Sequence, residues 1–176
     1  AALVAAAADA YARAVALGPD ELTYTLALAQ SWLQLQRASA ALAFLRTDAQ
    51  RFEFAPGYHA TVAECQEQLG NWSAAASSWQ RVTAARDADE TVQERLATAL
   101  YAAQRYAEAA PVLDQLVARG GTHTPARIRL MLGDTYLALG RDADACDQAR
   151  QVLQQEPDQR PALRLLARAL AVAGQA

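Results

Sequence analysis

Carboxylates and histidines are the side chains of this sequence that are best suited to catalysis or metal binding. The acidic residues gather in two short groups, Asp142, Asp144 and Asp147, and Asp87, Asp89 and Glu90. Both groups stand where a helix is expected to begin, and carboxylates there cap free N–H groups and favour the positive end of the helix dipole. The first group also lacks the glycine and glutamate spacing of a calcium loop. We therefore assign no metal ion and no cofactor.

The histidines and cysteines add no support for an enzyme. His59 and His123 have no evident nucleophile or metal partner nearby, and the sequence holds no GxSxG, HExxH, GxGxxG or phosphate-loop motif. Cys65 and Cys146 lack a CxxC spacing, which favours buried thiols over a metal site or a disulfide. Reduced thiols slightly favour the cytoplasm over the periplasm but leave the compartment open. We predict a protein that is not an enzyme.

The composition favours an all-helical protein. The 176 residues include 45 alanines against nine valines and one isoleucine, a balance typical of helices and not of sheets. The 16 cations, all arginine, are outnumbered by 19 acids, and the net charge of −3 disfavours binding to nucleic acid. No apolar run of about 20 residues is present, so we predict no insertion into a membrane.

Small residues recur at intervals of 34 residues, with one step of 36. The first series is Ala29, Ala63, Ala97, Gly133 and Ala167, and the second is Ala7, Ala41, Ala75, Ala109 and Ala145. Larger, mostly apolar residues flank both series at helical spacing, so each small residue lets a neighbouring helix approach closely. On this seam we expect Trp32, Trp79 and Tyr136 to lie in the core. Two short amphipathic helices are predicted for each 34 residues.

Glycines and prolines fall between the expected helices. Turns are predicted around Gly70, Gln104 and Gly140, and the two extra residues of the long step belong in the turn-rich stretch 120–125. The prolines between units are Pro19, Pro56, Pro125 and Pro157. Pro111 stands inside an expected helix, which it should loosen or kink.

These residues resemble the tetratricopeptide repeat, whose pattern is W-x2-L-G-x2-Y, then A-x3-F, then P. The fullest match is Leu132, Gly133 and Tyr136 with Ala145 and Pro157. The leading tryptophan position departs from the pattern, since it holds Thr25, His59, Gln93, Arg129 and Leu163. A sibling family of helical hairpins is the alternative.

The expected fold class is all-α, an α-solenoid of about ten helices stacked as antiparallel pairs, and the resemblance implies a right-handed superhelix. We divide this single solenoid into the second helix of a truncated repeat (1–19), four full repeats (20–55, 56–88, 89–123 and 124–158) and a lone or capping helix (159–176). Because the alanine-rich N-terminal helix lacks the polar outer face of a solenoid end, we expect the chain to be a fragment of a longer protein. The alanine-rich composition, with arginine as its only cation besides histidine, favours a bacterial origin.

The resemblance implies that the first helix of each pair lines a concave groove. The residues offset from the seam toward this groove are Leu26, Gln30, Glu64, Glu67, Glu94, Thr98, Tyr101, Leu130, Asp134, Arg164 and Arg168. The groove would be mixed apolar and acidic in its middle, with arginines at one end. The other interpretation is that these are ordinary polar positions on a solvated face.

Such a groove favours a non-catalytic interaction module that binds a peptide or protein segment carrying basic and apolar residues. The carboxylate clamp of some family members is disfavoured, because the chain has no lysine and its only asparagine, Asn71, stands in a turn. The alternatives are a structural spacer that self-associates end to end, or an accessory region of a larger enzyme.

Overall fold

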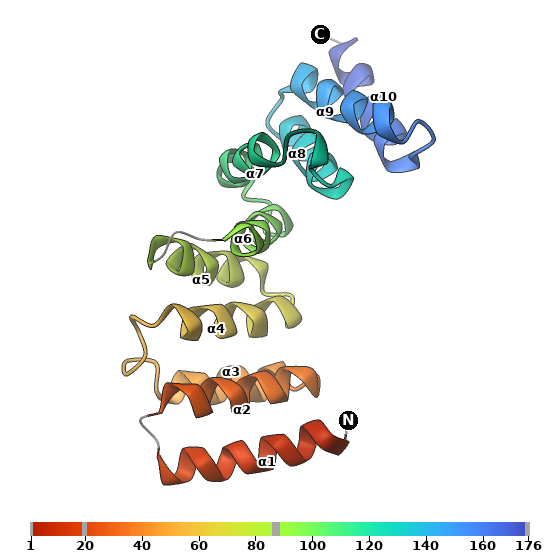
Figure 1. The fold of residues 1–176 in the computed structure, drawn as a ribbon. Coiled ribbons are helices and arrows are strands. Elements are labelled where there is room, and N and C mark those ends of the chain that lie inside the picture. Colours follow the sequence, from red (N-terminus) through yellow and green to blue (C-terminus); the bar gives the residue numbers. More distant parts are fainter. Residues whose placement is uncertain (1, 19–20, 86–88, 175–176) are drawn as a thin grey trace. The chain divides into compact units, whose positions relative to one another are not determined.

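The computed structural model describes residues 2–18, 21–85 and 89–174, which form ten α-helices, one short 3-10 helix and no strand (Figure 1). The α-helices are α1 Ala2–Leu17, α2 Leu22–Gln34, α3 Ala38–Thr47, α4 Pro56–Gln68, α5 Trp72–Ala85, α6 Glu90–Ala102, α7 Tyr106–Gly120, α8 Ala126–Ala138, α9 Asp142–Gln155 and α10 Arg160–Ala173. The 3-10 helix, η1, spans Gly121–His123. The all-helical solenoid predicted from the repeat is thereby confirmed.

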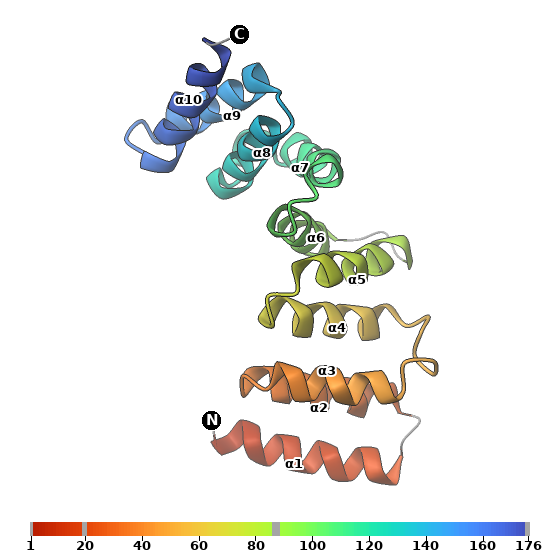
Figure 2. The ribbon, with the colours of Figure 1, turned by 180° about the vertical axis from the view of Figure 1, so that it is seen from behind.

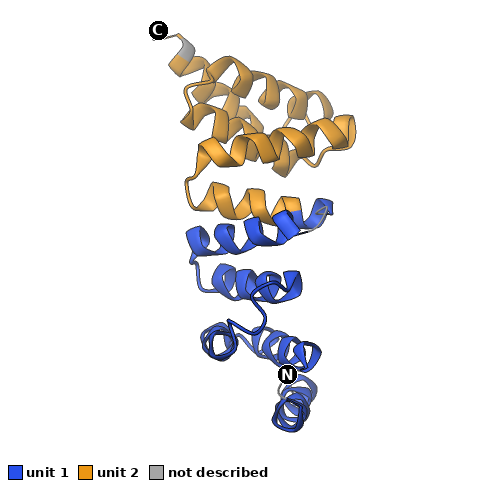
Figure 3. Cartoon of the chain, turned by 90° about the vertical axis from the view of Figure 1, so that its left-hand side faces the viewer, with its two compact units in different colours: residues 1–92 blue, residues 93–176 orange. Residues whose placement is uncertain are grey.

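The chain forms two compact units, Ala1–Val92 and Gln93–Ala176 (Figure 3). In the first unit each helix from α1 to α5 packs on the next, and α2 also packs on α4. Figures 1 and 2 view this unit from opposite sides, with α2 in front of α3 in one and behind it in the other. The second unit repeats the arrangement, because α7 to α10 pack in order and α8 also packs on α10. Alternate helices therefore form the two layers expected of stacked helix pairs.

The small residues of both series lie where helices meet. The fully buried alanines are Ala29, Ala63, Ala97, Ala41, Ala75, Ala109 and Ala145. At Gly133 an added Cβ would overlap with Leu165 Cδ2 of α10, so the Leu165 side chain would have to shift to admit a methyl group. A third buried series, which the sequence analysis missed, stands two residues after the first: Ser31, Cys65, Ala99, Thr135 and Ala169.

The outermost members of the series do not behave like the inner ones. Ala167 and Leu170 of α10 are exposed, and on α1 Ala7 is half-buried and Tyr11 is 36% exposed. These were expected on the buried seam, and that expectation is wrong for the end helices. The reason is that within the described residues no further helix packs on α10 after α9, or on α1 before α2.

The turns inside the helix pairs share one backbone conformation. Gln36, Gly70, Gln104 and Gly140 all have a left-handed φ, between 59° and 73°, and stand one repeat apart. Glycine adopts this conformation without the steric cost that glutamine bears. The predicted turns are thus confirmed, and Gln36 adds one that no glycine marks.

The two extra residues of the long step lie in η1, as the stretch 120–125 predicted. Thr124, directly after η1, is buried and donates a hydrogen bond to the Gly121 carbonyl at 2.9 Å. Helix α7 continues past Pro111 to Gly120, so this proline does not end the helix. Pro19 lies outside the described residues.

The seam aromatics are placed as predicted, with one difference of degree. Trp79 and Tyr136 are buried, whereas Trp32 is half-buried and packs on the core cluster of the first unit. Its ring meets the edge of Phe44 at 5.4 Å between centroids. Gln66 of α4 is a buried polar residue, and its Oε1 accepts a hydrogen bond from Ser78 Oγ of α5 at 2.8 Å.

Candidate protein-binding site

In the second unit, three helices that begin a pair, α6, α8 and α10, line an open cavity of about 480 Å³ together with the first residue of α7. Its walls are Tyr101, Tyr106, Asp134, Leu137, Ala138, Arg168, Ala171 and Val172. Three predicted groove residues, Tyr101, Asp134 and Arg168, are therefore brought together, although they stand more than 30 positions apart in the sequence. We call this set the α6–α8–α10 site.

An ion pair occupies the middle of this site. Arg168 Nη1 of α10 donates to Asp134 Oδ1 of α8 at 2.7 Å. The same two residues line a second, smaller cavity of about 220 Å³ that also includes Leu130 and Arg164. The ion pair thus lies between the larger cavity, which is aromatic and apolar, and the smaller cavity, which contains the additional arginine Arg164. Because both side chains remain partly exposed, the pair contributes little to stability and can exchange partners readily.

Tyr101 supplies an aromatic wall with a polar tip. Its ring lies edge-on to Tyr106, with 5.9 Å between centroids. Burial raises the pKa of the Tyr101 hydroxyl, and the negative charge of Asp134 adds to the rise. The hydroxyl is protonated at neutral pH and forms a hydrogen bond with the Asp134 side chain.

The remaining groove residues of α6 are engaged with the protein itself. Arg127 Nη2 of α8 donates to Glu94 Oε2 at 2.6 Å, and Thr98 Oγ1 donates to the Glu94 carbonyl at 2.8 Å. With Arg127 beside Glu94 and Arg168 beside Asp134, the acidic character expected for this stretch is largely neutralised within the unit.

The groove residues of the first unit differ in their surroundings. Leu26 packs on the core cluster, whereas Gln30 is exposed and Glu64 is half-buried. Glu67 accepts a hydrogen bond from the indole Nε1 of buried Trp79 at 2.7 Å, which links α4 to α5. This hydrogen bond of Glu67 therefore stabilises the packing of α4 on α5.

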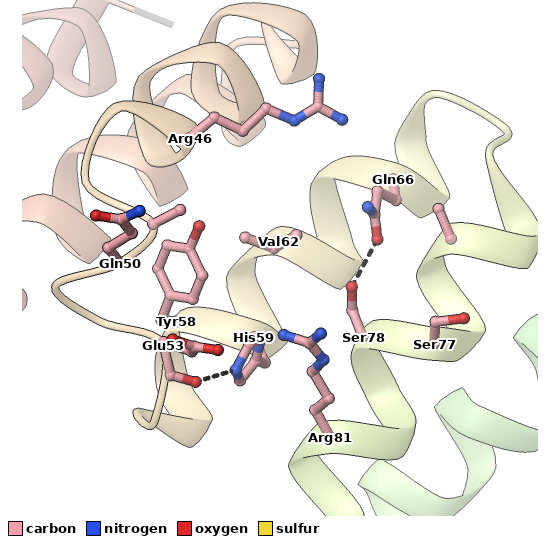
Figure 4. Close-up of a pocket in the computed structure, with 12 residues that line it drawn as sticks. Arg46, Gln50, Glu53, Tyr58, His59, Val62, Gln66, Ser77, Ser78 and Arg81 are labelled. Carbon is pink, nitrogen blue, oxygen red and sulfur yellow. Dashed lines mark hydrogen bonds between the residues drawn. The ribbon is translucent and has the colours of Figure 1, made fainter.

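A second large cavity, of about 680 Å³, lies on the first unit between α3, the loop 48–55, α4 and α5 (Figure 4). Arg46, Glu53, His59, Gln66 and Arg81 are among its walls. The sequence pattern did not predict this cavity. Arg46 and Arg81 occupy different positions in their repeats, and the shape of the cavity depends on the loop between α3 and α4.

The remaining histidine and carboxylate side chains contact the protein itself, and the carboxylates stand at helix starts as predicted. His59 is buried and its Nε2 bonds to the Glu53 carbonyl at 2.6 Å. Asp142 and Asp144 stand in the first turn of α9, and Asp89 Oδ1 caps the Val92 N–H at 2.9 Å. Asp87 lies outside the described residues.

Both cysteines are buried free thiols. Burial raises the pKa of Cys65 to about 12, and the neighbouring Glu64 charge adds to the rise. Across the described part of the chain, no group of three or more His, Cys, Asp or Glu side chains is arranged to hold a metal ion. None of the helices described there has the length and apolar character needed to cross a membrane.

Comparison with known proteins agrees with this geometry. The family model described as Tetratricopeptide repeat matches residues 63–124 and 94–159, together more than half of the chain. This chain belongs to the tetratricopeptide repeat family. Members of this family are in general protein-interaction modules, and that broad role applies here. No curated protein matches the chain.

Solved structures share the fold at low sequence identity. YrrB, described as a TPR protein with an unusual peptide-binding site, is 17% identical with a TM-score of 0.72, covering 94% of this chain and 93% of YrrB. A MamA structure is 14% identical with a TM-score of 0.73, covering 89% and 84%. TTC0263, a thermophilic TPR protein of Thermus thermophilus, is 20% identical with a TM-score of 0.56, covering 97% and 90%. At these identities the likeness shows the fold alone.

Proposed function

We propose that this chain is a non-catalytic module that binds a peptide or protein segment at the α6–α8–α10 site. The proposal rests on one observation, a cavity whose walls include Tyr101 and Val172 and which also contains the ion pair between Asp134 and Arg168. A depression with an aromatic wall, apolar neighbours and a central charge pair has the composition of a peptide-binding pocket.

The chemistry of the site favours a segment with adjacent apolar and basic residues. An apolar side chain fits against Tyr101, Leu137 and Val172, which line the larger depression. A basic side chain can replace Arg168 as the partner of Asp134, because that exposed pair is weak in itself. The released Arg168 then faces a backbone carbonyl of the bound segment. YrrB, whose fold this chain shares, is itself described as peptide-binding, which adds modest support.

An arrayed peptide library tests the proposal. The 176-residue chain is applied to arrayed peptides, and the best binder is then measured by isothermal titration calorimetry. We expect enrichment of peptides with neighbouring basic and apolar residues, and a loss of affinity of about ten-fold or more for Tyr101→Ala and for Asp134→Asn. The substitution at Asp134 leaves the backbone and side-chain volume unchanged.

Two matched variants control for general effects. Tyr11→Ala removes a partly exposed tyrosine from α1, and Asp147→Asn breaks an exposed ion pair with Arg150 on α9, a helix that does not line the site. Both should keep wild-type affinity. If the α6–α8–α10 variants bind as well as these controls do, peptide binding at this site is ruled out.

A second candidate function, end-to-end assembly, is favoured by the terminal helices. Leu3 and Leu17 of α1 are 87% and 90% exposed, and Leu163 and Leu170 of α10 are about half exposed. Stacking of α10 on α1 of another copy would bury these faces in a head-to-tail chain. Sedimentation that shows a concentration-dependent increase in mass, abolished by Leu170→Glu, would support it.

A further inference from the structure

The cavity of the first unit carries a separate inference. Its two opposite walls come from second helices of their pairs, α3 with Arg46 and α5 with Arg81, and its floor comes from α4. Figure 4 shows Arg46 and Arg81 on opposite sides of the cavity, with Val62 between them and Tyr58 and His59 to one side. We call it the Arg46–Arg81 cavity. It is distinct from the α6–α8–α10 site, which lies in the other unit.

The two arginines lack a carboxylate partner. Among the described residues, the guanidinium groups of Arg46 and Arg81 take part in no ion pair or hydrogen bond. Burial raises the pKa of the Tyr58 hydroxyl, whereas the positive charges of Arg46 and Arg81 act on it in the opposite direction. Both guanidinium charges therefore act on the Tyr58 hydroxyl, where the charge of Asp48 opposes them. Two like charges directed at one cavity raise the local concentration of anions.

The floor of the cavity is held rigidly by hydrogen bonds. Tyr58 Oη donates to the Leu45 carbonyl at 3.2 Å, and His59 Nε2 donates to the Glu53 carbonyl at 2.6 Å. Gln66 Oε1 accepts from Ser78, which leaves the Gln66 amide N–H groups to act as donors toward a ligand. A site whose polar groups are already fixed loses little entropy when a ligand binds.

The charge balance selects a singly charged ligand. Glu53 also lines the cavity, so the charges of Arg46, Arg81 and Glu53 sum to one positive charge. A carboxylate neutralises this charge, whereas a phosphate dianion would leave a negative charge beside Glu53. The guanidinium group also matches the two oxygens of a carboxylate. A volume of about 680 Å³ exceeds that of one carboxylate and extends from the loop to α5, which leaves room for residues on both sides of it.

We propose that the Arg46–Arg81 cavity binds the side-chain carboxylate of a glutamate or aspartate within a partner peptide. The module would then hold two different segments, an acidic one at this cavity and a basic and apolar one at the α6–α8–α10 site. The two sites are tested separately, since the acidic peptide used here does not suit the second site.

Nuclear magnetic resonance on the 15N-labelled 176-residue chain tests this proposal. The probe is the blocked peptide acetyl-Gly-Ser-Glu-Ser-Gly-amide, and its glutamine analogue is the matched control ligand. With the glutamate peptide we expect saturable shifts of the Arg46 and Arg81 Nε–Hε signals and of the His59 amide. The glutamine peptide should cause none.

Three variants locate the binding. Arg46→Gln with Arg81→Gln should weaken the glutamate peptide by about ten-fold or more. Glu53→Gln should strengthen it by about two-fold or more, because a repulsive charge is removed. Arg13→Gln with Arg160→Gln removes the same amount of charge from exposed positions on α1 and α10 and should leave the affinity unchanged.

Several results would overturn the proposal. The first is the absence of a saturable shift with up to about 20 mM of the glutamate peptide. The others are equal shifts with the glutamine peptide, or an unchanged affinity of the Arg46→Gln, Arg81→Gln variant for the glutamate peptide. Tighter binding of inorganic phosphate than of the glutamate peptide would overturn the choice of a monoanion. If a glutamine peptide with a free C-terminal carboxylate binds more tightly than the blocked glutamate peptide, the cavity prefers a C-terminal carboxylate, and the proposal of a side-chain carboxylate is wrong.

Discussion

Truncation of Trp79 should remove one buried contact between α4 and α5. Its side chain is only 3% exposed, and its indole Nε1 donates to Glu67 Oε1 at 2.7 Å. Replacing a buried tryptophan with alanine costs about 3–5 kcal/mol through lost burial and the cavity left behind. Trp79→Phe keeps most of the ring but not the hydrogen bond, so it should cost about 1–3 kcal/mol. Glu67→Gln keeps the Oε1 acceptor and should cost less than about 1 kcal/mol.

Urea unfolding followed by circular dichroism at 222 nm measures these free energies. Amide hydrogen exchange on the same variants shows where the loss occurs, because repeat proteins lose stability unit by unit. In Trp79→Ala we expect faster exchange in α4 and α5 than in α8 and α9. Tyr24→Ala, at a 41% exposed tyrosine of α2, is the control and should change the free energy of unfolding by less than about 0.5 kcal/mol. If Trp79→Ala unfolds within about 1 kcal/mol of the wild type, the assignment of the seam is wrong.

Four further outcomes follow from particular residues. Gly133→Ala should lower the free energy of unfolding by about 1 kcal/mol in urea, because overlap with Leu165 outweighs the gain in helix propensity. Gln104→Gly should raise it by about 0.5–1 kcal/mol, since glycine relieves a left-handed φ of 59°. Cys65, whose pKa is raised to about 12, should react with Ellman's reagent at pH 8 only as fast as the protein opens. Burial and the Asp114 hydrogen bond raise the pKa of Tyr136 to about 12. The protonated hydroxyl should therefore contribute its full stability below about pH 10, and this contribution should disappear as the pH rises to about 12. Urea unfolding across that pH range measures the loss.

Contrary results would each affect one argument. A more stable Gly133→Ala would show that α8 and α10 are not in close contact, and a destabilised Gln104→Gly would mean that the turn does not strain glutamine. Rapid labelling of Cys65 in the folded protein would contradict its burial. Ionisation of Tyr136 near pH 10, seen at 295 nm, would contradict its burial and its hydrogen bond to Asp114.

Sequence reasoning predicted the helices and their buried faces well, because both are local properties. A period of 3.6 residues determines which side chains share a face, and a period of 34 residues repeats the same pair of helices. Thus Ala63 and Ala97 could be placed at helix contacts, and they are fully buried. Ala167 was misplaced because burial also requires a neighbour, and within the described residues α10 has no helix packed on that face.

Parts of the site could be predicted by the same logic. Asp134 and Arg168 share one register of the repeat, directly after the small seam residue, and Tyr101 stands one helical turn further along its own helix. The repeat therefore places all three on the same side of successive first helices. The ion pair between Asp134 and Arg168 could not be predicted, since it depends on the separation and rotation of α8 and α10. That separation is set in part by Gly133, where the side chain of Leu165 occupies the space of a Cβ.

The sequence by itself determined the family, the number of helices, their pairing and the turns between them. Only the tertiary structure decided which polar groups meet, such as Glu67 with Trp79 or Arg129 with the Gly121 carbonyl. It alone also revealed the Arg46–Arg81 cavity, which an eight-residue loop between α3 and α4 opens. The physical reason is that periodicity encodes the face a residue occupies, whereas a contact between two side chains depends on distances set by the packing of whole helices.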